Sequence, residues 1–472
     1  MEPQTPQSPL QRLPLHLVAN ILVQLDTIQQ LGLLVLHHRV FYDALTDSTQ
    51  TVAGSIITRQ APQNALPFAI ALVESTRIDP SDHDAVRELL ARLEADILKY
   101  HSTGVILSAS HYTISEFAYL SRNLSALGIL RNDMIAEALP IFNRRFDVEH
   151  SSSTTEQEDF RINRAFLRYQ LMCNLFCLPS TVGGPLAKAE RTQFFFSKYS
   201  PWVNTQMLCV YAYIERKVSE AFDDVAAHNV EHGAMRIPWQ RHAAVNRQIQ
   251  WHASRGLPFL ASILSAKTYE ERLEIMPIFP KKNRFRKLDP VNQLMLMVPE
   301  DGLSKPLSVT DPWLELGSCS AAMLHKLAGP LDGEQDAPGS TPYNLWVDGH
   351  SHIWVARHAL FPQERHNMDS AYVMWDLDAP ASDLEGKCHE AYGRVASYKR
   401  ASTKWTESEL TRSEKQRSYI YDCGGRGYWP RRQSQEEEFD FGRIYGLSDQ
   451  QKEDLVAKFR MEIEMGIDDR WY

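Results

Sequence analysis

The chain has 472 residues, which is more than one hydrophobic core usually serves, so two or three domains are expected. Hydrophobic residues make up 43% and charged residues 23%, which is ordinary globular usage and excludes a chain that is disordered throughout. The formal net charge of -9 is small for this length and does not indicate general binding to nucleic acids or membrane surfaces.

The start of the chain, Met1 to Pro9, lacks the basic and apolar regions of a secretory signal. No apolar run approaches the roughly 20 residues that a membrane-spanning helix requires. The six cysteines are scattered and give no disulfide framework, which favours a reducing compartment. The sequence therefore predicts a cytoplasmic or nuclear protein that binds neither membrane nor nucleic acid.

Residues 1–10 are rich in Pro and Gln and are predicted to be a disordered lead. Residues 11–60 follow as a compact apolar unit, with Asp26 and Asp47 marking breaks because Asp disfavours helix interiors. Three helices are expected in this unit, at Leu13–Leu25, Ile28–Leu45 and Thr49–Arg59.

The helices of this unit carry more apolar surface than a single core explains. Apolar residues of the first helix cover an arc of roughly 160°, whereas a helix resting on one core needs about 100°. A unit of about 45 residues is also near the size below which chains seldom fold alone. Either the rest of this chain or another protein must cover the surplus, and the sequence leaves both interpretations open.

The order of residues in this unit resembles an F-box. The pattern is Leu13-Pro14-x-x-Leu17-x-x-x-Ile21-Leu22-x-x-Leu25-Asp26, followed by Leu31, Leu34, Leu36, Arg39, Phe41 and Tyr42. His16 stands where the family more often has Glu, and His38 where Cys is frequent. Three later blocks are similar to uncharacterised fungal F-box-like proteins: Arg164–Phe176, Ser200-Pro201-Trp202 and Tyr372–Asp376. The Glu-x-Glu-Gln that often follows the Trp in that group is matched here only at Gln206.

The resemblance implies a substrate receptor of an SCF-type ubiquitin ligase, with no chemistry and no cofactor on this chain. The F-box helices would bind a Skp-type adaptor and, through it, a cullin, while the remaining domain captures a protein substrate that the sequence does not identify. An F-box-like scaffold outside any ligase is the alternative. The adaptor-facing or supporting residues carried over from the family are Leu13, Pro14, Leu17, Ile21, Leu25, Leu31, Leu34 and Phe41.

The rest of the chain is predicted to be mainly α-helical. Residues 61–328 are expected to form a large helical domain, in which Thr113 and Glu116 have the spacing of a capping box at a helix start. The clearest amphipathic helices of this domain are expected at Asp82–Tyr100, Arg161–Cys177 and Trp202–Val225.

Residues 329–342 are rich in Gly, Pro, Asp and Ser and are predicted to be an exposed linker. Residues 343–472 are expected to be a minor mixed α/β region. The alternation of Ala371, Val373 and Trp375 favours a short strand, and a second strand is possible at Tyr419–Trp429. Ser448 and Gln451 have capping-box spacing, which predicts a final helix to about Met465.

A metal-dependent hydrolase is the third alternative, and one motif suggests it. In Asp348-Gly349-His350-Ser351-His352, the two histidines at a strand end would face one metal ion, as in a metal-dependent hydrolase. Too little chain follows His352 to supply the other ligands of such a barrel. Cys173 and Cys177 lie four residues apart, a spacing that could supply two of the four ligands of a zinc site. No second pair of matching spacing accompanies them, so they are better explained as core residues. The basic run Lys281–Lys287 favours a solvated loop over a nuclear import signal. The sequence thus predicts no catalytic residue and no metal site.

Overall fold

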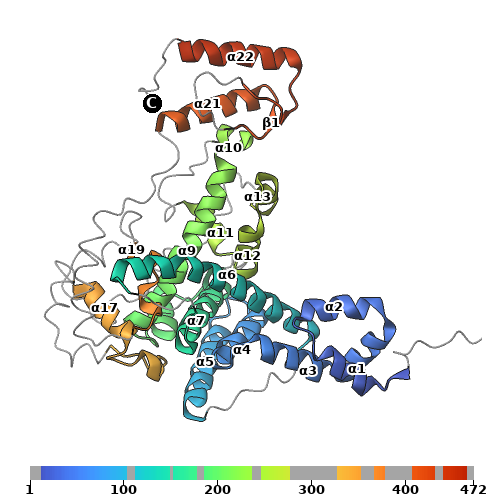
Figure 1. The fold of residues 1–472 in the computed structure, drawn as a ribbon, viewed down its shortest axis with the longest axis vertical. Coiled ribbons are helices and arrows are strands. Elements are labelled where there is room, and N and C mark those ends of the chain that lie inside the picture. Colours follow the sequence, from blue (N-terminus) through green and yellow to red (C-terminus); the bar gives the residue numbers. More distant parts are fainter. Residues whose placement is uncertain are drawn as a thin grey trace, which may run out of the picture. The chain divides into compact units, whose positions relative to one another are not determined.

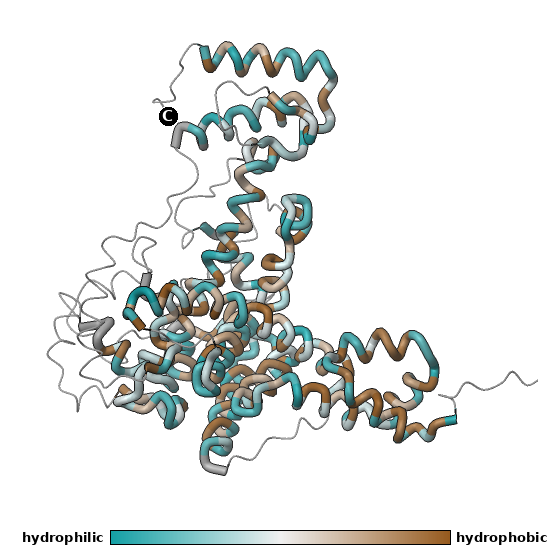
Figure 2. Tube along the Cα trace, viewed as in Figure 1, coloured by the Kyte–Doolittle hydropathy of each residue, from teal (hydrophilic) through white to brown (hydrophobic). Residues whose placement is uncertain are grey.

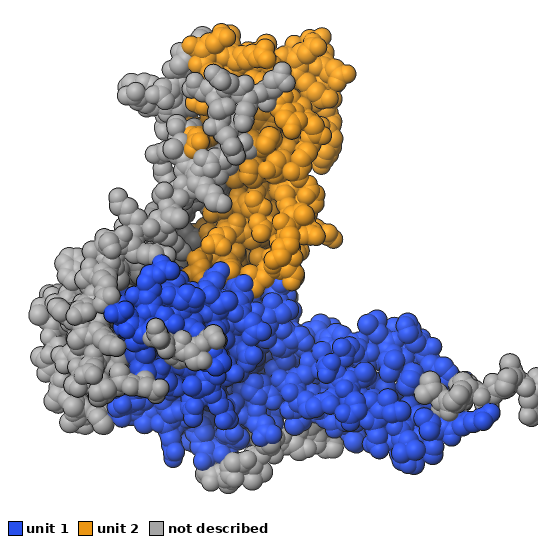
Figure 3. Space-filling model, in the orientation of Figure 1, with its two compact units in different colours: residues 1–213, 254–261, 293–395 blue, residues 214–253, 262–292, 396–472 orange. Residues whose placement is uncertain are grey.

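The structure is a computed structural model of the chain. It describes residues 12–103, 112–148, 153–177, 185–235, 246–276, 327–351, 366–377, 407–430 and 439–464. Contacts between residues divide the chain into two compact units (Figure 3). Unit 1 comprises Met1–Tyr213, Ser254–Ala261 and Gln293–Val395, and unit 2 comprises Ile214–Ala253, Ser262–Asn292 and Ala396–Tyr472. Apart from one two-stranded sheet, the described elements are helices, which confirms the predicted fold class.

Unit 1 begins with three helices, α1 (Leu15–Leu22), α2 (Ile28–His37) and α3 (Arg39–Gln60). Both α1 and α2 pack against α3 (Figure 1). The predicted number of helices is confirmed, but the predicted end of the second helix is wrong. His38 adopts an extended conformation, with φ of -154° and ψ of 131°, and its Nδ1 accepts the Val40 N–H at 3.1 Å as the cap of α3. The break expected at Asp47 is instead a kink within α3 at Ser48.

The remainder of unit 1 packs around α4 and α7, which contact each other. Its larger helices are α4 (Leu66–Glu74), α5 (His83–Thr103), α6 (Ile114–Phe146), α7 (Glu156–Met172) and the part of α9 (Pro201–Ala226) up to Tyr213. Its shorter segments are η2 (Gln63–Ala65), η3 (Ser75–Arg77), η4 (Cys173–Cys177), α8 (Lys188–Arg191), η5 (Thr192–Phe196), η8 (Glu334–Asp336), α17 (Thr341–Ser351), α19 (His366–Asp369) and η9 (Tyr372–Met374). The capping box at Thr113 and Glu116 is present, as predicted.

Two predictions for the later part of unit 1 are wrong. The segment 329–342, expected to be an exposed linker, contains Leu331, Asp332 and Asp336, all of which are buried. The segment from Ala371 to Trp375, expected to be a strand, instead forms η9 and is completely buried. Every residue of that segment is buried. The alternation of apolar residues therefore did not mark a strand with one buried face and one exposed face.

Unit 2 holds the remaining part of α9, with α10 (Val230–Ala234), α11 (Arg247–Ala253), part of α12 (Leu257–Ser265), α13 (Tyr269–Ile275), α21 (Glu407–Asp422), β1 (Arg426–Gly427), β2 (Ile444–Tyr445) and α22 (Asp449–Glu464). The strand predicted at Tyr419–Trp429 is largely wrong, because α21 continues to Asp422 and β1 begins only at Arg426. The capping box of Ser448 and Gln451 at the start of α22 is confirmed by both of its hydrogen bonds.

The sheet and α22 of unit 2 share one apolar core of Val230, Ile420, Trp429, Ile444, Leu455 and Phe459. Strands β1 and β2 are antiparallel and pair Gly427 with Ile444. Gly427 has φ of +112°, and a Cβ atom there would lie 2.3 Å from the Arg443 carbonyl oxygen, so only glycine fits this position. No described helix of either unit combines the length and apolar character needed to cross a membrane.

Candidate docking surface

One side of α1 is buried, and another side exposes large apolar residues. Val18 and Leu22 are fully buried, whereas Leu17 and Ile21 are 41% and 47% exposed. Residues four apart lie on the same side of a helix, so each pair forms a stripe along α1. Leu13 and Leu15 are also exposed. The surplus apolar surface that the sequence indicated is therefore left uncovered by the described residues.

Helix α2 and the start of α3 show the same excess. Leu33 and Leu36 on α2 are 63% and 83% exposed, and Tyr42 on α3 is 57% exposed. Hydrophobic residues dominate α1 and α2 in Figure 2. We call the exposed residues Leu13, Leu15, Leu17, Ile21, Leu33, Leu36 and Tyr42 the docking surface.

All residues of the docking surface except Tyr42 lie in a stretch with very little charge. Between Leu13 and His38, Asp26 is the only Asp, Glu, Lys or Arg residue. The central parts of protein interfaces are depleted of charged residues in the same way, because charges that lose water on binding must find partners. An exposed surface that is both apolar and uncharged is suited to burial against another protein.

The residues that the F-box resemblance indicated fall into three groups. Leu13, Pro14, Leu17 and Ile21 are exposed, while Leu25 and Leu34 are half-buried. Leu31 and Phe41 are buried within the chain, so they support the surface from behind. The residues carried over from the F-box did not include Leu15 and Leu33, which are both exposed. For Leu33, the uninterrupted apolar run Leu33–Leu36 was a signal of exposure.

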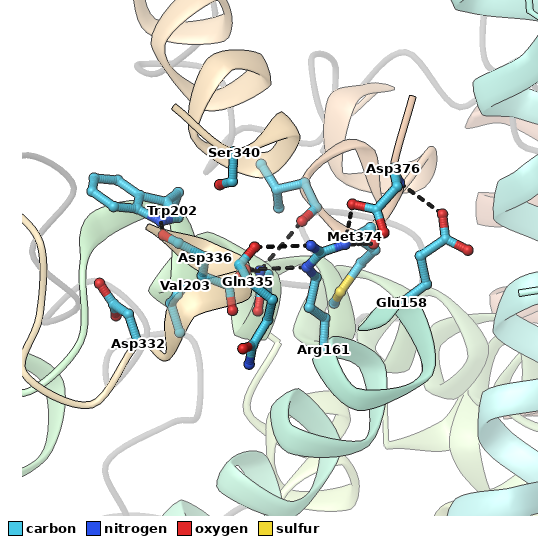
Figure 4. A network of polar contacts seen from close by, with 12 residues as sticks. Glu158, Arg161, Trp202, Val203, Asp332, Gln335, Asp336, Ser340, Met374 and Asp376 are labelled. Carbon is cyan, nitrogen blue, oxygen red and sulfur yellow. Dashed lines mark hydrogen bonds and ion pairs between the residues drawn. The ribbon is translucent and has the colours of Figure 1, made fainter. Parts of the chain in front are cut away.

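The blocks that resemble fungal F-box-like proteins meet at a buried polar network in unit 1 (Figure 4). On α7, Arg161 and Arg164 both pair with Asp336, at 3.1 and 2.6 Å. Arg161 also pairs with Asp376 at 2.7 Å. The three arginines Arg161, Arg164 and Arg168 follow one face of α7 because they are spaced by three and four residues.

Neighbouring segments complete this network. Gln206 on α9 accepts from Arg164 at 2.6 Å and donates to Asp336 at 3.1 Å. The Trp202 indole N–H donates to the Asp336 carbonyl oxygen at 2.7 Å. Asp332 accepts the N–H groups of Ser200 and Gly329, but burial outweighs these bonds and raises the pKa of Asp332 to about 6.

This network is enclosed, since Arg161, Arg164 and Asp336 are each at most 2% exposed. The two guanidinium groups also donate to the backbone carbonyl oxygens of Asp332, Gln335 and Met374, so the network joins α7 to η8 and η9. Gln206 connects it to α9. Trp202 and Gln206 are also buried and serve the fold of unit 1, whereas the side chain of Asp376 is 32% exposed.

The pair of candidate metal ligands lies only partly within the described residues. His350 lies on α17, which is a helix and not the expected strand, and His352 lies outside the described residues. Cys173 and Cys177 are buried core residues, as favoured from the sequence. Within the described ranges, no group of three or more His, Cys, Asp or Glu residues is arranged to hold a metal ion. The basic run Lys281–Lys287 lies outside those ranges.

The chain matches no protein-family model, no curated protein and no solved structure.

Proposed function

We propose that this protein is a non-catalytic, substrate-recruiting subunit of an SCF-type ubiquitin ligase, and that its docking surface binds a Skp-type adaptor. The observation that carries the proposal is the exposure of Leu17, Ile21 and Leu36 in a stretch with one charged residue. These residues stand at positions where the sequence resembles an F-box. In this function the ubiquitin chemistry occurs on other subunits, in the cytoplasm or nucleus.

The energetics of the surface support docking. Burying apolar surface contributes about 25 cal/mol for each Å² removed from water, and a specific interface buries roughly 1,200–2,000 Å² in total. Seven large exposed apolar side chains, six on α1–α3 and Leu13 just before α1, offer a substantial part of one partner's share. Because the surface is nearly uncharged, we expect an affinity that changes little with salt concentration.

The test is a binding measurement with purified protein and a purified Skp-type adaptor. We expect the wild type to form a stable complex and the Pro14→Ala/Leu17→Ala variant to lose most of its affinity, since Leu17 belongs to the docking surface and Pro14 is exposed between two of its residues in the chain. Leu98→Ala is the matched control, because Leu98 is 43% exposed on α5 and lies outside α1–α3. Equal recovery of the adaptor with all three proteins would count against the proposal.

A second measurement separates a ligase subunit from a scaffold that uses the same surface. Tagged wild-type protein purified from cells should carry both a cullin and the adaptor. The Pro14→Ala/Leu17→Ala variant should carry neither. Recovery of the adaptor without any cullin would assign the protein to a scaffold outside a ligase.

A further inference from the structure

The turn between α1 and α2 is held by a side chain from the far end of α3. Helix α1 ends at Leu22, and the carbonyl groups at a helix end have no partners within the helix. The Arg59 guanidinium, in the last turn of α3, donates to the carbonyl oxygens of Val23 and Leu25. These are the hydrogen bonds of Arg59 within the described residues, and they connect the end of α1 directly to α3.

The start of α2 is fixed by different groups. The Thr27 hydroxyl accepts the Gln30 N–H at 3.1 Å, and the Gln30 side chain accepts the Asp26 N–H at 2.9 Å. Ser121 on α6 accepts the Ile28 N–H at 3.2 Å. These contacts fix α2 to α6, whereas Arg59 connects the end of α1 to α3.

We propose that Arg59 is a positioning residue of the docking surface, an inference that rests on the proposed function. By holding the α1–α2 turn, Arg59 fixes the exposed stripe of α1, Leu17 and Ile21, relative to Leu36 on α2. A surface that is already ordered before binding loses less conformational entropy when the partner arrives. Arg59 is itself exposed, and its removal leaves the buried contacts of Val18 and Leu22 in place.

The experiment compares Arg59→Gln, Arg59→Lys and wild type for binding to the purified Skp-type adaptor, at a temperature where all are folded. We expect Arg59→Gln to weaken binding about tenfold per folded molecule, and Arg59→Lys to recover part of the loss, because an ammonium group still donates to a carbonyl oxygen. Arg92→Gln, which removes an exposed arginine from α5, should bind as wild type. Hydrogen exchange of the free protein should quicken at the end of α1 in Arg59→Gln, less so in Arg59→Lys, and not in Arg92→Gln.

The outcomes distinguish the two proposals. If the wild type does not bind the adaptor, the proposed function fails. If the wild type binds and Arg59→Gln binds equally well per folded molecule, only the positioning role of Arg59 is overturned. A loss of affinity that merely follows a larger unfolded fraction would also overturn it, since a structural role alone produces that result.

Discussion

Asp336 and Asp84 are both carboxylates paired with arginine, yet their surroundings differ completely. Asp336 is fully buried between Arg161 and Arg164, whereas the Asp84 side chain beside Arg87 is 94% exposed. Removing one member of a buried pair leaves uncompensated charge in the interior, while an exposed pair is screened by water. Burial, and not the presence of a pair, decides what each carboxylate contributes to stability.

We therefore expect Asp336→Asn to lower the free energy of unfolding by about 3 kcal/mol, because two buried guanidinium groups lose their shared carboxylate. Asp84→Asn should leave the free energy of unfolding almost unchanged. Urea titration followed by tryptophan fluorescence measures both, since Trp202 contacts the network directly. Similar changes in the two variants would show that the network is not stabilised by its charges.

We expect His232 to make unit 2 sensitive to acid. Burial and the neighbouring Arg417 lower the pKa of His232 to about 3, from an ordinary value of 6.5. Between these values the unfolded chain takes up a proton that the folded chain does not. Stability is therefore retained above about pH 6.5 and falls as the pH decreases, by up to about 1.4 kcal/mol for each pH unit.

The comparison of wild type with His232→Leu isolates this effect. Both proteins carry Asp223, whose pKa burial raises to about 8, so the opposite trend of that group cancels. We expect the difference in unfolding free energy between the two proteins to be constant above about pH 7 and to change in favour of the variant below about pH 6. Parallel stability curves across this range would exclude His232 as the cause.

At the scale of elements, the sequence predicted the features that residues close together in the chain determine. The capping boxes at Thr113 and Ser448 are confirmed, because neighbouring residues along the chain determine them. The helix predicted at Trp202–Val225 is confirmed as α9, and the one predicted at Arg161–Cys177 begins earlier, at Glu156, and ends as α7 at Met172. The division between α2 and α3 was missed because the acceptor that caps α3 is the His38 ring, which standard capping preferences do not include. The burial of Asp332 and Asp336 was missed because their partners lie far away in the sequence.

Helix α2 offers a test of capping within the docking unit. Thr27→Ala removes the side-chain acceptor for the Gln30 N–H and should lower the free energy of unfolding by about 1 kcal/mol. Thr27→Ser keeps the hydroxyl and should behave as wild type. Thermal unfolding followed by circular dichroism measures the difference, and equal transition temperatures for Thr27→Ala and Thr27→Ser would rule out this cap as a stabilising contact.

At the scale of the whole molecule, the segments that the sequence singled out differ in exposure. Those of α1–α3 leave apolar side chains exposed, whereas those of α7, α9 and η9 are buried within unit 1. Helical periodicity indicated the apolar excess of α1 and α2, but it did not indicate which side chains face outward, because packing against α3 and α6 decides that. The docking surface is therefore the part of this chain that the proposed function depends on.

The most direct test is calorimetric titration of a purified Skp-type adaptor into wild type, Leu36→Lys and Leu98→Lys. Leu36 is 83% exposed in the last turn of α2, where a cation suits the helix dipole, so the substitution should leave the fold intact. We predict that Leu36→Lys weakens binding about 100-fold, because the new charge must lose its water without gaining a partner, while Leu98→Lys binds as wild type. Unchanged affinity in Leu36→Lys would contradict the assignment of α1–α3 as the docking surface.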